Sequence, residues 1–449
     1  MADEPQTGPG DSSDSNDNEG DSPAEAGASN TPGNPFGAFG LGSGMPFGTE
    51  GLGPLGALDF SQLGAMLQSD GPLNWEIARQ TAAWVAAGDT AATAPTPDAP
   101  VDPATRAEIL ALVDIAVTHV VGATGLSGSF ETRRDVLGPQ AWAHQQLDAL
   151  KPVLEAFATT LERALIEEIQ SGETPLDLTA NPFGFLAGGD PFGGIMKMLA
   201  PVLLGVQAGS MVGYLAQHAI GRYDLPLPLD AEPSLVFVAQ NLDAFQTSWE
   251  LDRNDTRLYI ALHETVHAAV RSVPWVRERL VNLAIEYVQA YTIDANAMDQ
   301  QFEGLDPTDP STFAAAGANP IALLGAIRGP GQDDVLDRLR TFASVIEGYG
   351  DAVLDHIGRP LVASFDRIHE ALARHRLERG EAGQFIEGLL GVDLQREHYE
   401  AGRTFADGVV ERAGLDGLNQ LWDDARRLPT PAELSAPGLW LARLEVMDD

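Results

Sequence analysis

Apolar side chains recur with the three-to-four-residue spacing of an α-helix over most of the chain, which predicts a mainly helical protein. Asn74 is a favourable N-cap for a helix over 75–87, and Gly88 is suited to end that helix. Asp102 and Pro103 fit the N-cap and the first turn of a second helix. The stripe expected to be buried on this second helix consists of Ile109, Leu112, Val113, Ala116, Val117 and Val120.

The rest of the pattern adds further helices and at most a small sheet. Helical spacing covers 139–170, where Pro152 is expected to kink or break the helix. The run of branched and aromatic side chains over 234–238 is the strongest strand candidate. Helical spacing returns near Asp255 and continues with breaks to about Arg427. The predicted fold class is therefore mainly α, an α+β arrangement in which strands are a minor part.

The segment 198–221 contains no charged side chain over 24 residues, which is long enough to cross a membrane. Gly205, Gly209 and Gly213 recur every four positions, a spacing found where helices pack closely in membranes and in soluble cores alike. Polar residues and a proline interrupt the apolar character of the segment, at Pro201, Gln207, Gln217 and His218. We therefore expect a buried central helix here and no membrane partner.

Composition divides the 449 residues into four parts. Residues 1–57 are rich in Gly, Pro, Ser, Asn and Asp, which bury too little apolar surface to offset the entropy of ordering. They are predicted to form a disordered acidic leader. The parts predicted to follow are a helical domain over 58–222, a second domain over 223–428 and an acidic, proline-containing tail over 429–449.

Charge and cysteine content exclude several classes of protein. The chain has 65 acidic and 27 basic residues, a net charge of −38, whereas nucleic-acid binding depends on Lys and Arg that neutralise phosphates. We therefore expect no nucleic-acid partner. The absence of cysteine excludes disulfides, Cys zinc fingers and cysteine nucleophiles. The first basic residue is Arg79, so the basic start of a secretory signal is missing and a cytoplasmic location is expected.

The pentapeptide H-E-T-V-H at 263–267 is the most informative motif. On a helix, His263 and His267 share one face and can bind one metal ion, with Glu264 beside them. Chance alone would produce an H-E-x-x-H match only about 0.01 times in a chain of this composition. The motif therefore predicts His263 and His267 as zinc ligands and Glu264 as the catalytic base.

A catalytic zinc ion needs a third protein ligand. The positions at which metzincins carry a glycine and a third histidine hold valines in this chain. Glu347 is the best candidate, because it shares a helix face with Asp351 if the segment is helical. Glu347 could then bind the metal while Asp351 accepts the N–H of a ligand histidine. Glu286 and Asp294 are rival ligands at a closer spacing.

Four segments carry a family resemblance: G-P-L-N-W at 71–75, Y-D-L-P-L-P at 223–228, H-E-T-V-H at 263–267 and I-E-G-Y-G-D at 346–351. Together they resemble the actinobacterial zincin-like metallopeptidase family, often labelled as associated with biosynthesis of a deazaflavin coenzyme. The resemblance covers about 71–430. It implies a mostly helical zincin-like fold with His263 and His267 as metal ligands. It also implies that Glu264 is the catalytic glutamate and Glu347 the acidic ligand.

Two functions agree with these residues. The first is a zinc-dependent metallopeptidase-like hydrolase with one zinc ion per chain, in which zinc-bound water activated by Glu264 attacks a peptide or small amide carbonyl. The second is a catalytically silent, zincin-derived helical protein for binding or assembly. The presence of Glu264 favours the enzyme, because a structural metal site needs no base. Tyr349, His356 and Tyr259 are candidates for the group that stabilises the oxyanion.

Overall fold

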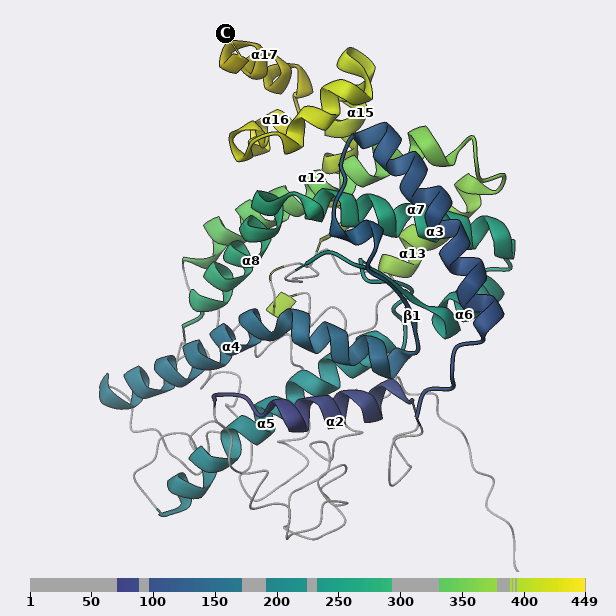
Figure 1. Ribbon diagram of the computed structural model, residues 1–449. Helices are drawn as coiled ribbons and strands as arrows, with labels where there is room; N and C mark the ends of the chain where they lie inside the picture. Colours follow the sequence, from purple (N-terminus) through teal and green to yellow (C-terminus); the bar gives the residue numbers. More distant parts are fainter. Residues whose placement is uncertain are drawn as a thin grey trace, which may run out of the picture. The chain divides into compact units, whose positions relative to one another are not determined.

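Helices form most of the described structure, a computed structural model in which two short strands complete the fold (Figure 1). The structure describes residues 71–88, 97–171, 191–223, 232–292, 331–377, 388–389, 391 and 394–448. The α-helices are α2 (Trp75–Ala86), α3 (Pro103–Thr124), α4 (Pro139–Ser171), α5 (Pro191–Ala216), α6 (Ala239–Ser248), α7 (Arg253–Ser272), α8 (Pro274–Gln289), α12 (Gln332–Gly358), α13 (Phe365–Leu377), α15 (Arg396–Asn419), α16 (Pro431–Leu434) and α17 (Pro437–Asp448). The 3₁₀-helices are η3 (Ser129–Glu131), η5 (Gln420–Trp422) and η6 (Ala425–Arg427). The predicted mainly helical class is confirmed, and the predicted leader over 1–57 lies outside the described residues.

The small sheet consists of β1 (Arg134–Leu137) and β2 (Leu235–Val238), which pair in parallel. The predicted strand over 234–238 is confirmed as β2, and all four of its residues are buried. The strand β1 was not predicted, because the first two of its four residues are charged and the segment lacks the apolar pattern of a strand. A single antiparallel bridge joins Gly221 to Phe237 and holds the chain at 221 beside β2.

A row of glycines lets α5 pack directly on α2, and Figure 1 shows the two helices side by side. A Cβ atom on Gly209 would overlap the carbonyl oxygen of Ala78, and the glycines one turn before and after it approach α2 in the same way. At the start of α2, Asn74 donates its backbone N–H to the carbonyl oxygen of Pro201, at 2.8 Å. The segment 198–221 therefore contributes a packed helix, as its glycine spacing predicted.

The helix α3 is the one helix in the described part of the chain that is long and apolar enough to cross a membrane. Core helices of soluble proteins meet the same criterion. Asp102 caps α3 by accepting the N–H of Thr105, at 2.9 Å, and Pro103 occupies the first turn, as predicted. One face of α3 is buried against α7, through Ile109, Val113, Ala116 and Val120.

The helix α7 lies at the centre of the described core, in contact with α3, α6, α8, α12, α13 and β2. Asp252 is the N-cap of α7, and its side chain accepts hydrogen bonds from the backbone N–H groups of Asn254 and Asp255. The neighbouring helix α12 packs on α15 with almost no space between the backbones, because a Cβ atom on Gly348 would overlap the carbonyl oxygen of Gly402. The helix α12 also contacts α7 directly, so that one face of α12 lies beside one face of α7.

The predicted break at Pro152 does not occur: the helix α4 continues through this residue, and Leu150 and Val153 on either side are buried in the core. The predicted acidic, proline-containing tail contains α16 and α17, and in α17 Trp440 is buried and packs edge-on against Phe405. The boundary proposed between the two domains at 222 and 223 stays a prediction.

Candidate active site

The H-E-x-x-H motif lies on α7, as its spacing predicted, and its chemical side chains are buried. His263 and His267 are each 2% exposed, and Glu264 is 1% exposed. The two imidazoles stand on one face of the helix, with ring centroids 4.4 Å apart and planes tilted by 49°. The i, i+4 spacing has therefore brought both rings to one place.

Both imidazoles are held in the neutral form. Burial, reinforced by the positive charge of Arg376, keeps the pKa of His263 well below its usual range. Burial and the neighbouring ring of His263 lower the pKa of His267 in the same direction. A neutral imidazole has a nitrogen lone pair available, which is the state that binds a metal ion.

Glu264 is positioned by a segment that precedes it by about forty residues. Its Oε2 accepts the backbone N–H groups of Arg222, at 2.7 Å, and Tyr223, at 3.2 Å. Its Oε1 lies 3.3 Å from Nδ1 of His263. A Cβ atom at Gly221 would overlap the carboxylate, so only glycine leaves room for it there. These contacts orient the carboxylate beside the two histidines.

Glu347 joins this group from α12. It is 4% exposed, and its Oε1 lies 3.8 Å from Nδ1 of His267. The rival Glu286 is exposed at the surface, where it pairs with Arg338. Asp294 lies outside the described residues. The structure thus brings Glu347, and not Glu286, to the two histidines; we call His263, Glu264, His267 and Glu347 the active-site cluster.

Asp351 is one helical turn beyond Glu347 on α12 and is partly buried. Burial raises its pKa to about 6, although the positive charges of Arg376 and Arg403 act in the opposite direction. The expected hydrogen bond from a ligand histidine to Asp351 is not formed among the described residues; the nearby charge of Arg376 acts on Asp351 instead.

The side chains of two arginines that the sequence did not indicate, Arg271 and Arg376, touch the active-site cluster. Arg271 lies on α7, four residues beyond His267, and its Nη1 is 3.0 Å from Nδ1 of that ring. Its guanidinium also lies over the ring of Tyr223, at 5.0 Å. The i, i+4 spacing could have indicated Arg271.

Arg376 reaches the cluster from α13. Its Nη1 is 3.4 Å from Oε2 of Glu347, and its Nη2 contacts Nε2 of His263. Burial disfavours the charge of Arg376, but Glu347 raises the pKa of the guanidinium above its usual range. No local pattern connects Arg376 to a motif more than a hundred residues earlier, so only the packing of α13 reveals it.

Two of the three predicted candidates for an oxyanion-stabilising group, Tyr349 and Tyr259, have other partners. The hydroxyl of Tyr349 donates to Asn419, at 2.7 Å, and its ring packs edge-on against Trp422. The hydroxyl of Tyr259 lies 2.8 Å from Nδ1 of His369. His356 is exposed near the end of α12. The contacts of the two tyrosines are those of residues that stabilise the fold.

The donor set of the cluster fits a zinc ion in its chemistry: two neutral imidazoles and a carboxylate from two adjacent helices. The positions of the donors are less favourable. Across the described ranges, no three His, Cys, Asp or Glu side chains converge on one point. The guanidinium of Arg376, a cation, contacts both His263 and Glu347.

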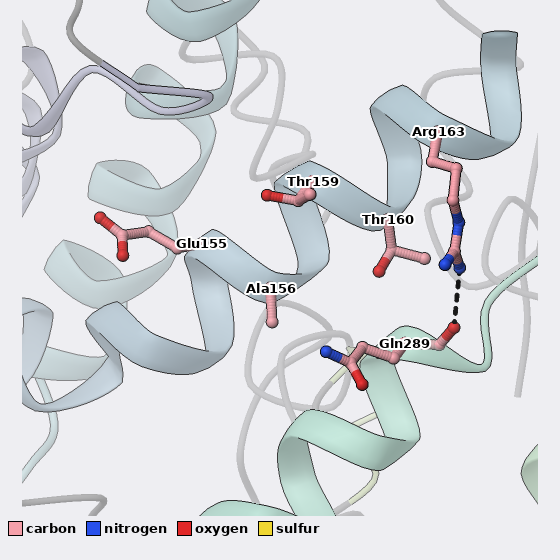
Figure 2. A pocket seen from close by; sticks show the side chains of 6 residues that line it. All are labelled: Glu155, Ala156, Thr159, Thr160, Arg163 and Gln289. Carbon is pink, nitrogen blue, oxygen red and sulfur yellow. Dashed lines mark hydrogen bonds between the residues drawn. The ribbon is translucent and has the colours of Figure 1, made fainter.

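A separate pocket of about 370 Å³ lies between α4 and α8 (Figure 2). Across it Arg163 donates to the carbonyl oxygen of Gln289, at 3.3 Å. Its lining residues are Glu155, Ala156, Thr159, Thr160, Arg163 and Gln289. None of them belongs to the active-site cluster.

The sequence profile of the zincin-like metallopeptidase family matches residues 73–441, so the chain belongs to that family. Among solved structures, the chain is similar to a crystal structure from Chloroflexus aurantiacus, described as a proposed hydrolase with a novel fold. The TM-score is 0.53 at 26% sequence identity, and the match covers 83% of this chain and 99% of the other. No curated protein matches. The actinobacterial origin and the link to a deazaflavin coenzyme stay predictions.

Proposed function

We propose that the protein is a zinc-dependent hydrolase of peptide or small amide bonds, with one zinc ion per chain. One observation carries the proposal: Glu347 from α12 meets the imidazoles and Glu264 of α7 in one buried cluster. Two imidazoles and a carboxylate are a ligand set typical of catalytic zinc. Membership of the zincin-like metallopeptidase family and the similarity to a proposed hydrolase support the same reaction class.

In this proposal His263, His267 and Glu347 hold the ion. Bound zinc supplies a Lewis acid that polarises the substrate carbonyl and makes a water molecule easier to deprotonate. Glu264 takes a proton from the attacking water and passes it to the leaving nitrogen. The N–H groups of Arg222 and Tyr223 orient that carboxylate, and burial of the cluster excludes bulk water. The protein thus supplies the base, its orientation and a dry environment.

The test combines metal content with cleavage of a peptide library and of small amides. We expect about one zinc ion per chain in the wild type and in Glu264→Gln, because this variant keeps every proposed ligand. Only the wild type should cleave at a normal rate, with Glu264→Gln slower by roughly 10² to 10⁴. A zinc-loaded wild type that cleaves neither kind of substrate would contradict a hydrolase and favour a binding or assembly protein.

A further inference from the structure

Arg376 contacts two of the three proposed zinc ligands. Its side chain, 10% exposed, reaches Oε2 of Glu347 and Nε2 of His263. Because Nδ1 of His263 faces the carboxylate of Glu264, Nε2 is the nitrogen left with a lone pair. A guanidinium can only donate hydrogen bonds, so Arg376 uses the lone pair that a metal ion would need. The guanidinium and a metal ion cannot both occupy this position.

The charges of the cluster lead to the same conclusion. Glu347 pairs with Arg376, and the charges of Glu264 and Glu347 act on Arg271, so these two carboxylates and two guanidiniums balance when both imidazoles are neutral. A divalent cation would add two positive charges in a buried environment, where like charges repel strongly. Withdrawal of Arg376 would move its own positive charge away from the cluster and so reduce this repulsion. Arg271 is less able to leave, because it also donates to the carbonyl oxygen of His267 on its own helix.

Building on the proposed zinc site, we propose that Arg376 occupies the metal position in the metal-free protein and must withdraw before zinc can bind. Asp351 is the carboxylate that receives the displaced guanidinium, since it is one turn beyond Glu347 and already attracts Arg376. Arg376 therefore sets the metal affinity of the protein. Only the fraction of molecules with Arg376 withdrawn is competent to bind, and the apparent affinity falls by that fraction.

The first experiment measures the zinc affinity of the full chain by competition with a chromogenic chelator. The variants are Arg376→Gln and, as a matched control, Arg374→Gln. Arg374 lies on the same helix and carries the same charge, but it is exposed and pairs with Glu370. If fewer than about a tenth of the molecules are competent, Arg376→Gln should bind zinc at least roughly tenfold more tightly than the wild type. Arg374→Gln should bind as the wild type does.

Each outcome decides something different. Equal or weaker zinc binding by Arg376→Gln would overturn this inference and leave the proposed zinc site intact. Absence of zinc binding in the wild type and in both variants would overturn the proposed function as well. Circular dichroism of each metal-free variant separates a change in affinity from a loss of folding.

A measurement on the wild type avoids dependence on a variant. Phenylglyoxal modifies accessible arginines, and peptide mapping by mass spectrometry reports each site. Arg376 should react slowly in the metal-free protein, where it is buried, and faster after zinc is added. The exposed Arg374 should react equally in both states. Unchanged or slower labelling of Arg376 on addition of zinc would overturn the inference.

The role of Asp351 is tested by a double-mutant cycle. Asp351→Asn should weaken zinc binding in the wild-type background, because the displaced guanidinium loses its acceptor. In the Arg376→Gln background the same substitution should have no effect. A loss of affinity that persists in that background would mean that Asp351 acts on the ligands directly, and would overturn its role as acceptor.

Discussion

The backbone at Gly221 lies so close to the carboxylate of Glu264 that a Cβ atom at position 221 would overlap it. This backbone is held in place, because Gly221 is bridged to Phe237 and its carbonyl oxygen accepts the indole N–H of Trp142, at 2.8 Å. The position of the proposed base therefore depends on the absence of a side chain in a different segment of the chain.

We predict that Gly221→Ala lowers the rate of hydrolysis without removing zinc. The added methyl group displaces the carboxylate of Glu264 from the N–H groups of Arg222 and Tyr223. Since a well-placed general base contributes roughly 10² to 10⁴ to a rate, a loss of about tenfold or more is expected. The rate and the zinc content are measured together. Gly122→Ala is the control, because a Cβ atom there meets nothing within 4 Å. An unchanged rate in Gly221→Ala would contradict the role of Glu264.

We predict that Gly348→Ala destabilises the protein. A Cβ atom at position 348 would overlap the backbone of α15 at Gly402, and backbone cannot yield as the end of a side chain can. Overpacking of this kind lowers the free energy of unfolding by about 1–3 kcal/mol, more than the helix propensity of alanine returns. Urea denaturation measures the change. Gly122 is exposed on a helix, so Gly122→Ala should slightly raise the free energy of unfolding. A similar rise in Gly348→Ala would show that α12 and α15 are not packed this closely.

We predict that the third zinc ligand is Glu347 and not Glu286. Glu347→Gln removes a charged donor from the buried cluster and should weaken zinc binding by about a hundredfold or more. Glu286→Gln only breaks a surface ion pair with Arg338 and should keep about one zinc ion per chain. Elemental analysis after dialysis distinguishes the two. Full zinc content in Glu347→Gln would place the third ligand elsewhere.

We predict a pH-dependent gain in stability for metal-free Asp351→Asn. The pKa of Asp351 is about 6 in the folded protein against 3.8 as its ordinary value, so its contribution to stability is present below pH 4 and lost as pH rises through 6. Replacement by the uncharged amide should therefore raise the free energy of unfolding at pH 8, by roughly 1 kcal/mol for this partly exposed side chain. The gain should disappear near pH 4. Thermal unfolding at both pH values measures it, and an equal effect at both would contradict the raised pKa.

Much of the local structure could be predicted from short-range patterns. Asn74 and Asp102 cap the helices that they were expected to cap, and 234–238 contains the buried strand. These features depend on the neighbours of a residue along the chain, so a pattern of a few residues is enough. Where packing decided the outcome, the patterns were insufficient: α4 does not break at Pro152, and the strand β1 was not predicted.

The spacing of His263 and His267 is enough to predict that their rings share one face of α7, because every α-helix brings positions i and i+4 together. Which groups meet that face depends on the tertiary structure. It brought Glu347 to the histidines while leaving Glu286 at the surface, and it placed Arg376 on the same donors. Contacts between distant segments follow from how whole helices pack. That packing depends on close approaches between helices, such as that of Gly348 on α12 to the backbone of α15, which no local spacing encodes.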